Sequence, residues 1–140
     1  MVERTLVLVK PSGVARGLVG EIISRIERRG LTIRAARLLS VTPEMAAQHY
    51  AEHRDKPFYE ELVTHITSAP IFAMIVEGPS AVRVVRGMMG ATNPLDAAPG
   101  TVRGDFGLDV KRNVVHSADS LASAERELAI FFPEGGELTH

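Results

Sequence analysis

His116 ends a short apolar run in the stretch NVVHSADS, residues 113–120, and is followed by small polar residues. Imidazole can serve as a nucleophile, as a proton carrier or as an ordinary structural group. Two interpretations of His116 are therefore open from its own position: a nucleophile in a site, or a histidine that closes a strand. The residues that folding places beside His116 must decide between these two interpretations.

Glu127 is the candidate partner of this histidine. On a helix that begins near Ser120, Glu127 lies two turns further along, on the side that returns toward His116, whereas Glu125 points elsewhere. A carboxylate bonded to one imidazole nitrogen would fix the tautomer and leave the other nitrogen nucleophilic. The alternative is a solvated carboxylate, the usual state of a glutamate on such a helix.

Three cations and one hydroxyl are candidates for holding phosphate. Lys10 follows a predicted buried strand and precedes a Pro-Ser-Gly turn, where a compact ammonium is either solvated or bound to a phosphate. Arg86 and Arg103 flank the segment 90–113, and Thr92 lies near its start. Each arginine alone is typical of a surface charge, but two guanidinium groups at the ends of one loop could clamp a polyphosphate.

Two aromatic side chains have both a structural and a functional interpretation. Phe58 follows Pro57 at a predicted helix start, where it either packs that helix on the core or offers its face to a nucleobase. Tyr50 is either an amphipathic residue at a helix end or a phenol donor that points into a site.

The elements that must position these residues follow from hydrophobic periodicity and from turn residues. Strands are predicted at 4–10, 31–41, 70–78 and 113–116, and helices at 17–30, 42–50, 57–67, 80–89 and 120–132. This order favours an α+β, ferredoxin-like fold, an antiparallel four-stranded sheet covered by helices, which we expect on one face. The glycine- and proline-containing segment 90–113 is predicted to be a long surface loop, and such loops are usually functional.

Composition narrows the class of protein. With 140 residues, 45% of them hydrophobic, 24% charged, we expect a single globular domain over residues 1–140. A formal net charge of −1 argues against a broadly basic nucleic-acid surface, and the strands lack the interleaved aromatics of an RNA-binding sheet. The absence of cysteine excludes thiolate catalysis and disulfides. With no signal-peptide or membrane-span pattern, we expect a cytoplasmic protein.

The sequence has no glycine-rich phosphate-binding motif of the P-loop or dinucleotide type. Any phosphate binding therefore needs side chains.

The sequence also resembles the nucleoside diphosphate kinase family. From Glu3 to about Pro133, segments of this chain occur in the order and with the spacing of that family's motifs: ERTLVLVKPSG, RGLVGEII, HYAEH, KPFY, GATNP, APGTVRGDFG, NVVHSADS and SAERELAIFF.

The resemblance implies a chemistry. The family moves the γ-phosphoryl of a nucleoside triphosphate, typically ATP, to a nucleoside diphosphate through a phosphohistidine, in ping-pong fashion. By resemblance, His116 is the nucleophile, Glu127 orients it, and Lys10 and Tyr50 approach the transferred phosphoryl. Mg²⁺ is expected on the nucleotide phosphates, with no direct protein ligand.

The remaining implied roles are nucleotide contacts. The phosphates are assigned to Arg86, Thr92 and Arg103, the base to Phe58 and Val110, and the sugar to Asn113 and Lys10. The resemblance also implies a homo-oligomer built from dimers, a tetramer or a hexamer.

The turn after the histidine departs from the family pattern. The usual His-Gly-Ser-Asp-Ser is here His-Ser-Ala-Asp-Ser, so Ala118 lacks a hydroxyl that in relatives helps to tie the histidine to the glutamate. Ser117 replaces a glycine, which would strain the turn if that position needed a positive φ. Ser12 likewise replaces the family's aspartate. The alternative function is therefore a catalytically weakened nucleotide-binding member with a regulatory or binding role, and a nucleic-acid-binding module ranks below both.

Overall fold

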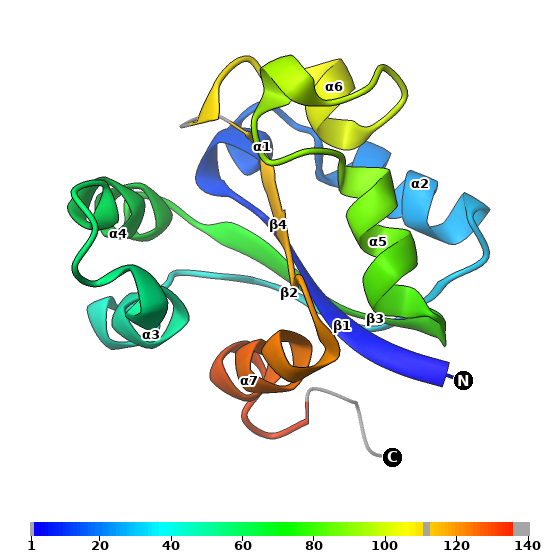
Figure 1. The fold of residues 1–140 in the computed structure, drawn as a ribbon. Helices are drawn as coiled ribbons and strands as arrows, with labels where there is room; N and C mark the ends of the chain where they lie inside the picture. Colours follow the sequence, from blue (N-terminus) through cyan, green and yellow to red (C-terminus); the bar gives the residue numbers. More distant parts are fainter. Residues whose placement is uncertain (1, 111–112, 136–140) are drawn as a thin grey trace.

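The computed structural model describes residues 2–110 and 113–135. Four antiparallel strands form one sheet in the order β2-β3-β1-β4, as Figure 1 shows. Their bounds are β1 Val2–Val9, β2 Thr32–Leu39, β3 Ile71–Pro79 and β4 Val115–Ser117. Leu8 of β1 pairs with His116 of the short β4, so the end of β1 that leads to Lys10 lies beside the histidine. The predicted α+β, ferredoxin-like class is confirmed.

Helices cover both faces of the sheet, not one. On one face lie α2 (Val19–Arg28) and α5 (Ala81–Met89), and on the other α3 (Pro43–His49), α4 (Tyr59–Thr67) and α7 (Leu121–Phe131). The expectation of a single covered face was wrong. It missed that apolar side chains follow one another without alternation along β1, which is the pattern of a strand buried on both faces.

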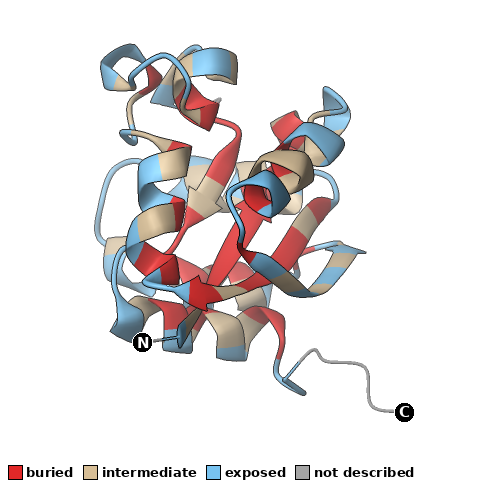
Figure 2. Ribbon diagram, turned by 90° about the vertical axis from the view of Figure 1, so that its right-hand side faces the viewer, coloured by how far each residue is buried: buried red, intermediate tan, exposed pale blue. Residues whose placement is uncertain are grey.

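Alternate residues of β1 enter two separate cores. Val7 and Val9 pack with α2 and α5, whereas Leu6 and Leu8 pack with α3, α4 and α7, and all four are fully buried. Figure 2 shows this burial on the strands and on the inward faces of the helices. Helices thus cover the sheet on both faces, although Leu38 of the edge strand β2 stays 60% exposed.

The segment predicted as a long loop contains short helices. It holds a 3₁₀ turn, η2 (Pro94–Asp96), and α6 (Val102–Phe106), each capped by a side chain, Asn93 and Thr101 respectively. Two further short elements, α1 (Pro11–Ala15) and the 3₁₀ turn η1 (Ala51–His53), also lie where no helix was predicted. Elements of three to five residues are too short to show hydrophobic periodicity.

Some expectations concern residues that are not described. Positions 111 and 112 of the predicted loop and the end of the chain at 136–140 lie outside the described residues, so a single domain over 1–140 stays a prediction. Across the described ranges, every helix is too short or too polar to cross a bilayer.

Candidate active site

A pocket of about 220 Å³ opens beside β4 and the end of β1. Eight of the ten candidate residues line it, although they come from six separate parts of the chain: Lys10, Tyr50, Arg86, Thr92, Arg103, Asn113, His116 and Glu127. The other two candidates, Phe58 and Val110, lie outside this lining. The fold thus brings together the cations, the histidine and the carboxylate that the sequence singled out.

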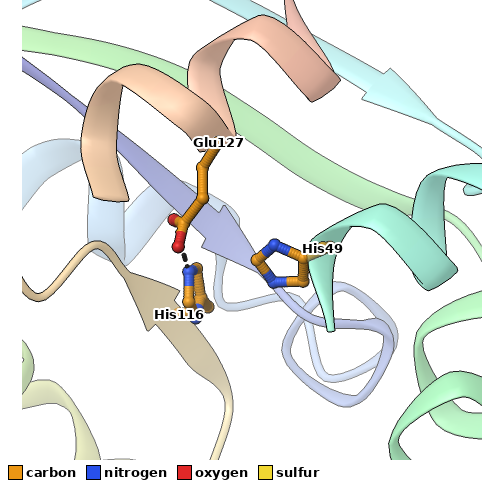
Figure 3. Close-up of side chains that lie close together, drawn as sticks. All are labelled: His49, His116 and Glu127. Atoms are coloured by element: carbon orange, nitrogen blue, oxygen red, sulfur yellow. Dashed lines mark hydrogen bonds and ion pairs between the residues drawn. The ribbon is translucent and has the colours of Figure 1, made fainter. Parts of the chain in front are cut away.

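His116 and Glu127 form a direct pair. The Nε2 atom of His116 lies 2.8 Å from Oε1 of Glu127, as Figure 3 shows. Ser120 caps α7 by accepting a hydrogen bond from the Ser123 N–H at 3.0 Å, and this start sets the register that turns Glu127 inward. Glu125, two residues earlier, is exposed. A carboxylate at Nε2 favours the Nε2–H tautomer, which leaves the lone pair on Nδ1.

The surroundings keep the imidazole neutral. Burial, followed by the positive charges of Lys10 and Arg103, lowers the pKa of His116 to about 3. Burial raises the pKa of Glu127, and the neighbouring His49 and Arg126 oppose that rise. A neutral imidazole with a free lone pair is the form that can attack an electrophile.

Lys10 is held by the segment that precedes His116. Its backbone N–H donates to the Val114 carbonyl at 2.8 Å, and its Nζ donates to Oδ1 of Asn113 at 3.0 Å. Asn113 in turn donates from Nδ2 to the Thr92 carbonyl at 3.3 Å. Burial and the charge of Arg103 lower the pKa of Lys10 to about 8, so its ammonium lacks a counter-charge that an anion would supply.

Arg103 links three parts of the pocket. From α6 it donates Nη1 to the Gly90 carbonyl at 2.7 Å and Nη2 to the Val115 carbonyl at 3.0 Å. Its Nε is buried and has no hydrogen-bond partner among the described residues. Burial and Arg86 lower the pKa of Arg103 to about 10. Gly90 has φ +89°, and a Cβ there would lie 2.4 Å from the Thr101 hydroxyl, so glycine is required at this crossing.

The backbone is strained two residues before the histidine. Val114 is fully buried and has φ 78°, a left-handed conformation that costs a β-branched residue about 1–3 kcal/mol. This conformation turns its carbonyl to the Lys10 N–H and so fixes the lysine beside β4. Among the described non-glycine residues only Ser80 and Val114 have positive φ, so the serine at 117 causes no strain of this kind.

Of the two aromatic candidates, Tyr50 lines the pocket and Phe58 does not. Tyr50 is 7% exposed at the end of α3, and burial, with the charge of Glu127, raises its pKa to about 12, so the phenol is a neutral donor. Phe58 is 44% exposed beside the ring of His53, which does not fit the interpretation that it packs α4 onto the core. Val110 is exposed in a wider groove of about 890 Å³ that shares Lys10 and Tyr50 with the first pocket.

Comparison with known proteins identifies the family. The family model described as nucleoside diphosphate kinase matches residues 3–136. The chain belongs to the nucleoside diphosphate kinase family. A nucleoside diphosphate kinase of Archaeoglobus fulgidus is 63% identical over 94% of this chain and 87% of its own length. One from Mycobacterium marinum is 60% identical over 95% and 98%. A solved nucleoside diphosphate kinase of Halobacterium salinarum in complex with CDP has a TM-score of 0.95 at 48% identity, covering 100% of this chain and 93% of that one.

The pocket also has residues that sequence reasoning missed. His49 lies with its ring centroid 4.6 Å from that of His116, and Nη2 of Arg126 lies 3.7 Å from Oε2 of Glu127. Asp119 is a third, with its carboxylate on the pocket wall. Each lies inside a motif that carried the family resemblance, HYAEH, NVVHSADS or SAERELAIFF, and that was the signal available in the sequence.

Proposed function

We propose that this enzyme transfers the γ-phosphoryl of a nucleoside triphosphate to a nucleoside diphosphate in two half-reactions, through a phosphohistidine at His116. The observation that carries the proposal is the 2.8 Å contact between His116 Nε2 and Glu127 in a pocket lined by Lys10, Arg86 and Arg103. A nucleophile, a group that orients it and a set of cations are what a covalent phosphoryl transfer requires.

The covalent step uses the nitrogen that Glu127 leaves unprotonated. The lone pair of His116 Nδ1 attacks the γ-phosphorus, and the bond from that phosphorus to the β–γ bridging oxygen breaks, which releases the nucleoside diphosphate. The ring becomes positively charged while Nε2–H donates to the Glu127 carboxylate, which stabilises that charge. In the second half-reaction a β-phosphate oxygen of the acceptor attacks the same phosphorus and the P–N bond breaks.

The cations prepare the pocket for phosphate. Burial and then Arg103 lower the pKa of Lys10, and burial and then Arg86 lower that of Arg103, because these like charges are held in the protein without counter-charge. A triphosphate would relieve this repulsion, and the cations would neutralise charge on the transferred group. The neutral phenol of Tyr50 can donate a hydrogen bond in the same pocket.

The wider groove supports binding of the nucleoside. It shares Lys10 and Tyr50 with the catalytic pocket, so a ligand that spans both would place its phosphates near His116 and its base near Val110. Val110 lines this groove, whereas Phe58 is exposed outside its lining. We assign the base to these two side chains, whose apolar surfaces do not read its edges, which suits acceptance of several bases. We assign the sugar to Asn113 and Lys10, which already bond one another.

We propose that Mg²⁺ arrives on the nucleotide phosphates. Mg²⁺ takes oxygen ligands, and cationic side chains outnumber carboxylates in the pocket lining, so this ion needs phosphate oxygens. The residues present therefore fit a Mg²⁺ ion carried by the substrate better than one held by the protein. When bound, the ion would neutralise charge on the phosphates during transfer.

The weakened-member alternative rests on the turn that follows His116, and it is not favoured. The contact between His116 and Glu127 is made although Ala118 lacks the hydroxyl, and the backbone of Ser117 is not strained.

We also propose a cytoplasmic location and a homo-oligomer, either a tetramer or a hexamer. Light scattering would measure the mass of the assembly.

The test of this function is the form of its kinetics. Initial rates with varied Mg-ATP at several fixed concentrations of dTDP should give parallel double-reciprocal lines, as expected for a covalent intermediate. His116→Asn should abolish the transfer, while Glu125→Gln should retain it. Intersecting lines, or full activity of His116→Asn, would contradict the proposal.

A further inference from the structure

His49 is a buried side chain that the proposed reaction does not use. It is 5% exposed at the end of α3, and neither of its ring nitrogens has a hydrogen-bond partner among the residues that the structure describes. Buried polar groups nearly always have a partner, so an imidazole with two unpartnered nitrogens needs a physical explanation. Its neighbours show what such a partner would be.

The imidazole of His49 lies beside the catalytic pair. One ligand atom each of His49, His116 and Glu127 can be chosen so that all three lie within 4.8 Å of one another. The three side chains come from α3, β4 and α7 and lie close together, as Figure 3 shows. Two imidazoles and one carboxylate facing one another form a ligand set typical of zinc.

We propose that His49, His116 and Glu127 form a binding site for Zn²⁺ or a similar borderline transition-metal ion. Bonds of about 2.0–2.2 Å in a tetrahedral site place ligand atoms about 3.3–3.6 Å apart. The three ligand atoms now lie within 4.8 Å of one another, so each separation would change by roughly 1.5 Å or less. The adjoining pocket leaves room for water as the fourth ligand. Mg²⁺ prefers oxygen ligands and would not compete for two imidazoles.

The metal would switch off the nucleophile, a consequence that rests on the proposed function. A metal between Glu127 and His116 takes the lone pair of Nε2 in place of the proton that Nε2 carries now. The neutral imidazole then carries its proton on Nδ1, which removes the lone pair that attacks phosphorus. The cations that hold phosphate are not metal ligands, so nucleotide should still bind while its phosphoryl stays untransferred.

The binding test uses untagged, full-length protein without nucleotide, titrated with Co²⁺ as a spectroscopic substitute for Zn²⁺. One Co²⁺ per chain with tetrahedral visible absorption, displaced by Zn²⁺ but not by excess Mg²⁺, is the expected result. His49→Phe keeps a ring against Phe131, whose centroid lies 5.2 Å away, and should weaken binding at least tenfold. His65→Gln, which removes an imidazole from nearby α4, is the matched control and should bind as the parent does.

Circular dichroism establishes that each variant is folded, and Glu127→Gln replaces His49→Phe if the latter is not. Absence of saturable Co²⁺ binding, or binding unchanged in the folded variant, would overturn the site.

A separate experiment measures labelling of His116 by γ-labelled ATP at saturating Zn²⁺, with nucleotide binding measured alongside. Loss of the label with nucleotide still bound is expected, and full labelling would overturn the inhibitory role. Absence of label without Zn²⁺ would count against the phosphohistidine, while the Co²⁺ titration still decides the metal site.

Discussion

Replacing Glu127 with Gln tests whether this carboxylate sets the reactivity of His116. The variant keeps the size of the side chain but exchanges an ionised acceptor for an amide at the 2.8 Å contact with Nε2. Hydrogen bonds to charged groups contribute about 1.5–3 kcal/mol and neutral ones about 0.5–1.5 kcal/mol, so the difference between the two midpoints, about 1.3 kcal/mol, is lost. If the loss falls on the transition state, phosphorylation of His116 slows about tenfold.

The folding stability of Glu127→Gln should not fall with its phosphorylation rate. Burial already raises the pKa of Glu127, because it disfavours the charged form, so a neutral amide of the same shape is at least as well tolerated there. We expect the phosphorylation rate constant, measured by rapid quench with Mg-ATP, to fall while the unfolding free energy changes by less than about 1 kcal/mol.

Glu125→Gln is the matched control for this prediction, since it lies on the same helix but is exposed. The reasoning is refuted if Glu127→Gln labels His116 within twofold of the parent rate. An equal loss in Glu125→Gln would also refute it.

Three further predictions concern the same pocket. Because the pKa of Lys10 is lowered to about 8, its cation is lost as pH rises through that value, and kcat/KM for Mg-ATP should fall above pH 8; a flat profile to pH 9.5 would contradict this. Because the pKa values of His49 and His116 are lowered to about 3, the unfolded chain binds protons below about pH 6.5 that the folded chain does not, so stability falls as pH falls. His49→Phe should reduce the slope of unfolding free energy, from urea melts at pH 6 to 4, by about 1.4 kcal/mol per pH unit, and an unchanged slope would count against it. Ala118→Ser should change the turnover rate less than tenfold, since one hydrogen bond contributes about 1 kcal/mol; restoration by several orders of magnitude would show that the altered turn disables the histidine.

The sequence predicted the strands and most helices well because their signals are local. The apolar run of β1, the Thr42 cap before α3 and the Ser120 cap before α7 are all readable in a few consecutive residues. Helix geometry then places Glu127 two turns after Ser120, on the side of α7 that faces His116, as expected.

Other features depend on tertiary structure and had no local signal. Val114 adopts a left-handed conformation that its own side chain disfavours, and only the surrounding packing holds it there. His49, at the end of α3, lies beside His116 of β4, a contact across 67 positions of sequence. Coverage of both sheet faces is different, because the unbroken apolar run of β1 indicated it, and only the choice of covering helices depends on how α3, α4 and α7 pack together.

The most direct test of the central claim is isolation of the phosphorylated enzyme. The protein is mixed with Mg-ATP labelled on the γ-phosphate, separated from nucleotide, tested for acid and alkali lability of its label, and chased with GDP. We expect an acid-labile, alkali-stable label that depends on His116 and leaves as GTP. A protein that binds ATP and transfers its phosphoryl to GDP without any such label, or equally well as His116→Ala, would contradict the account.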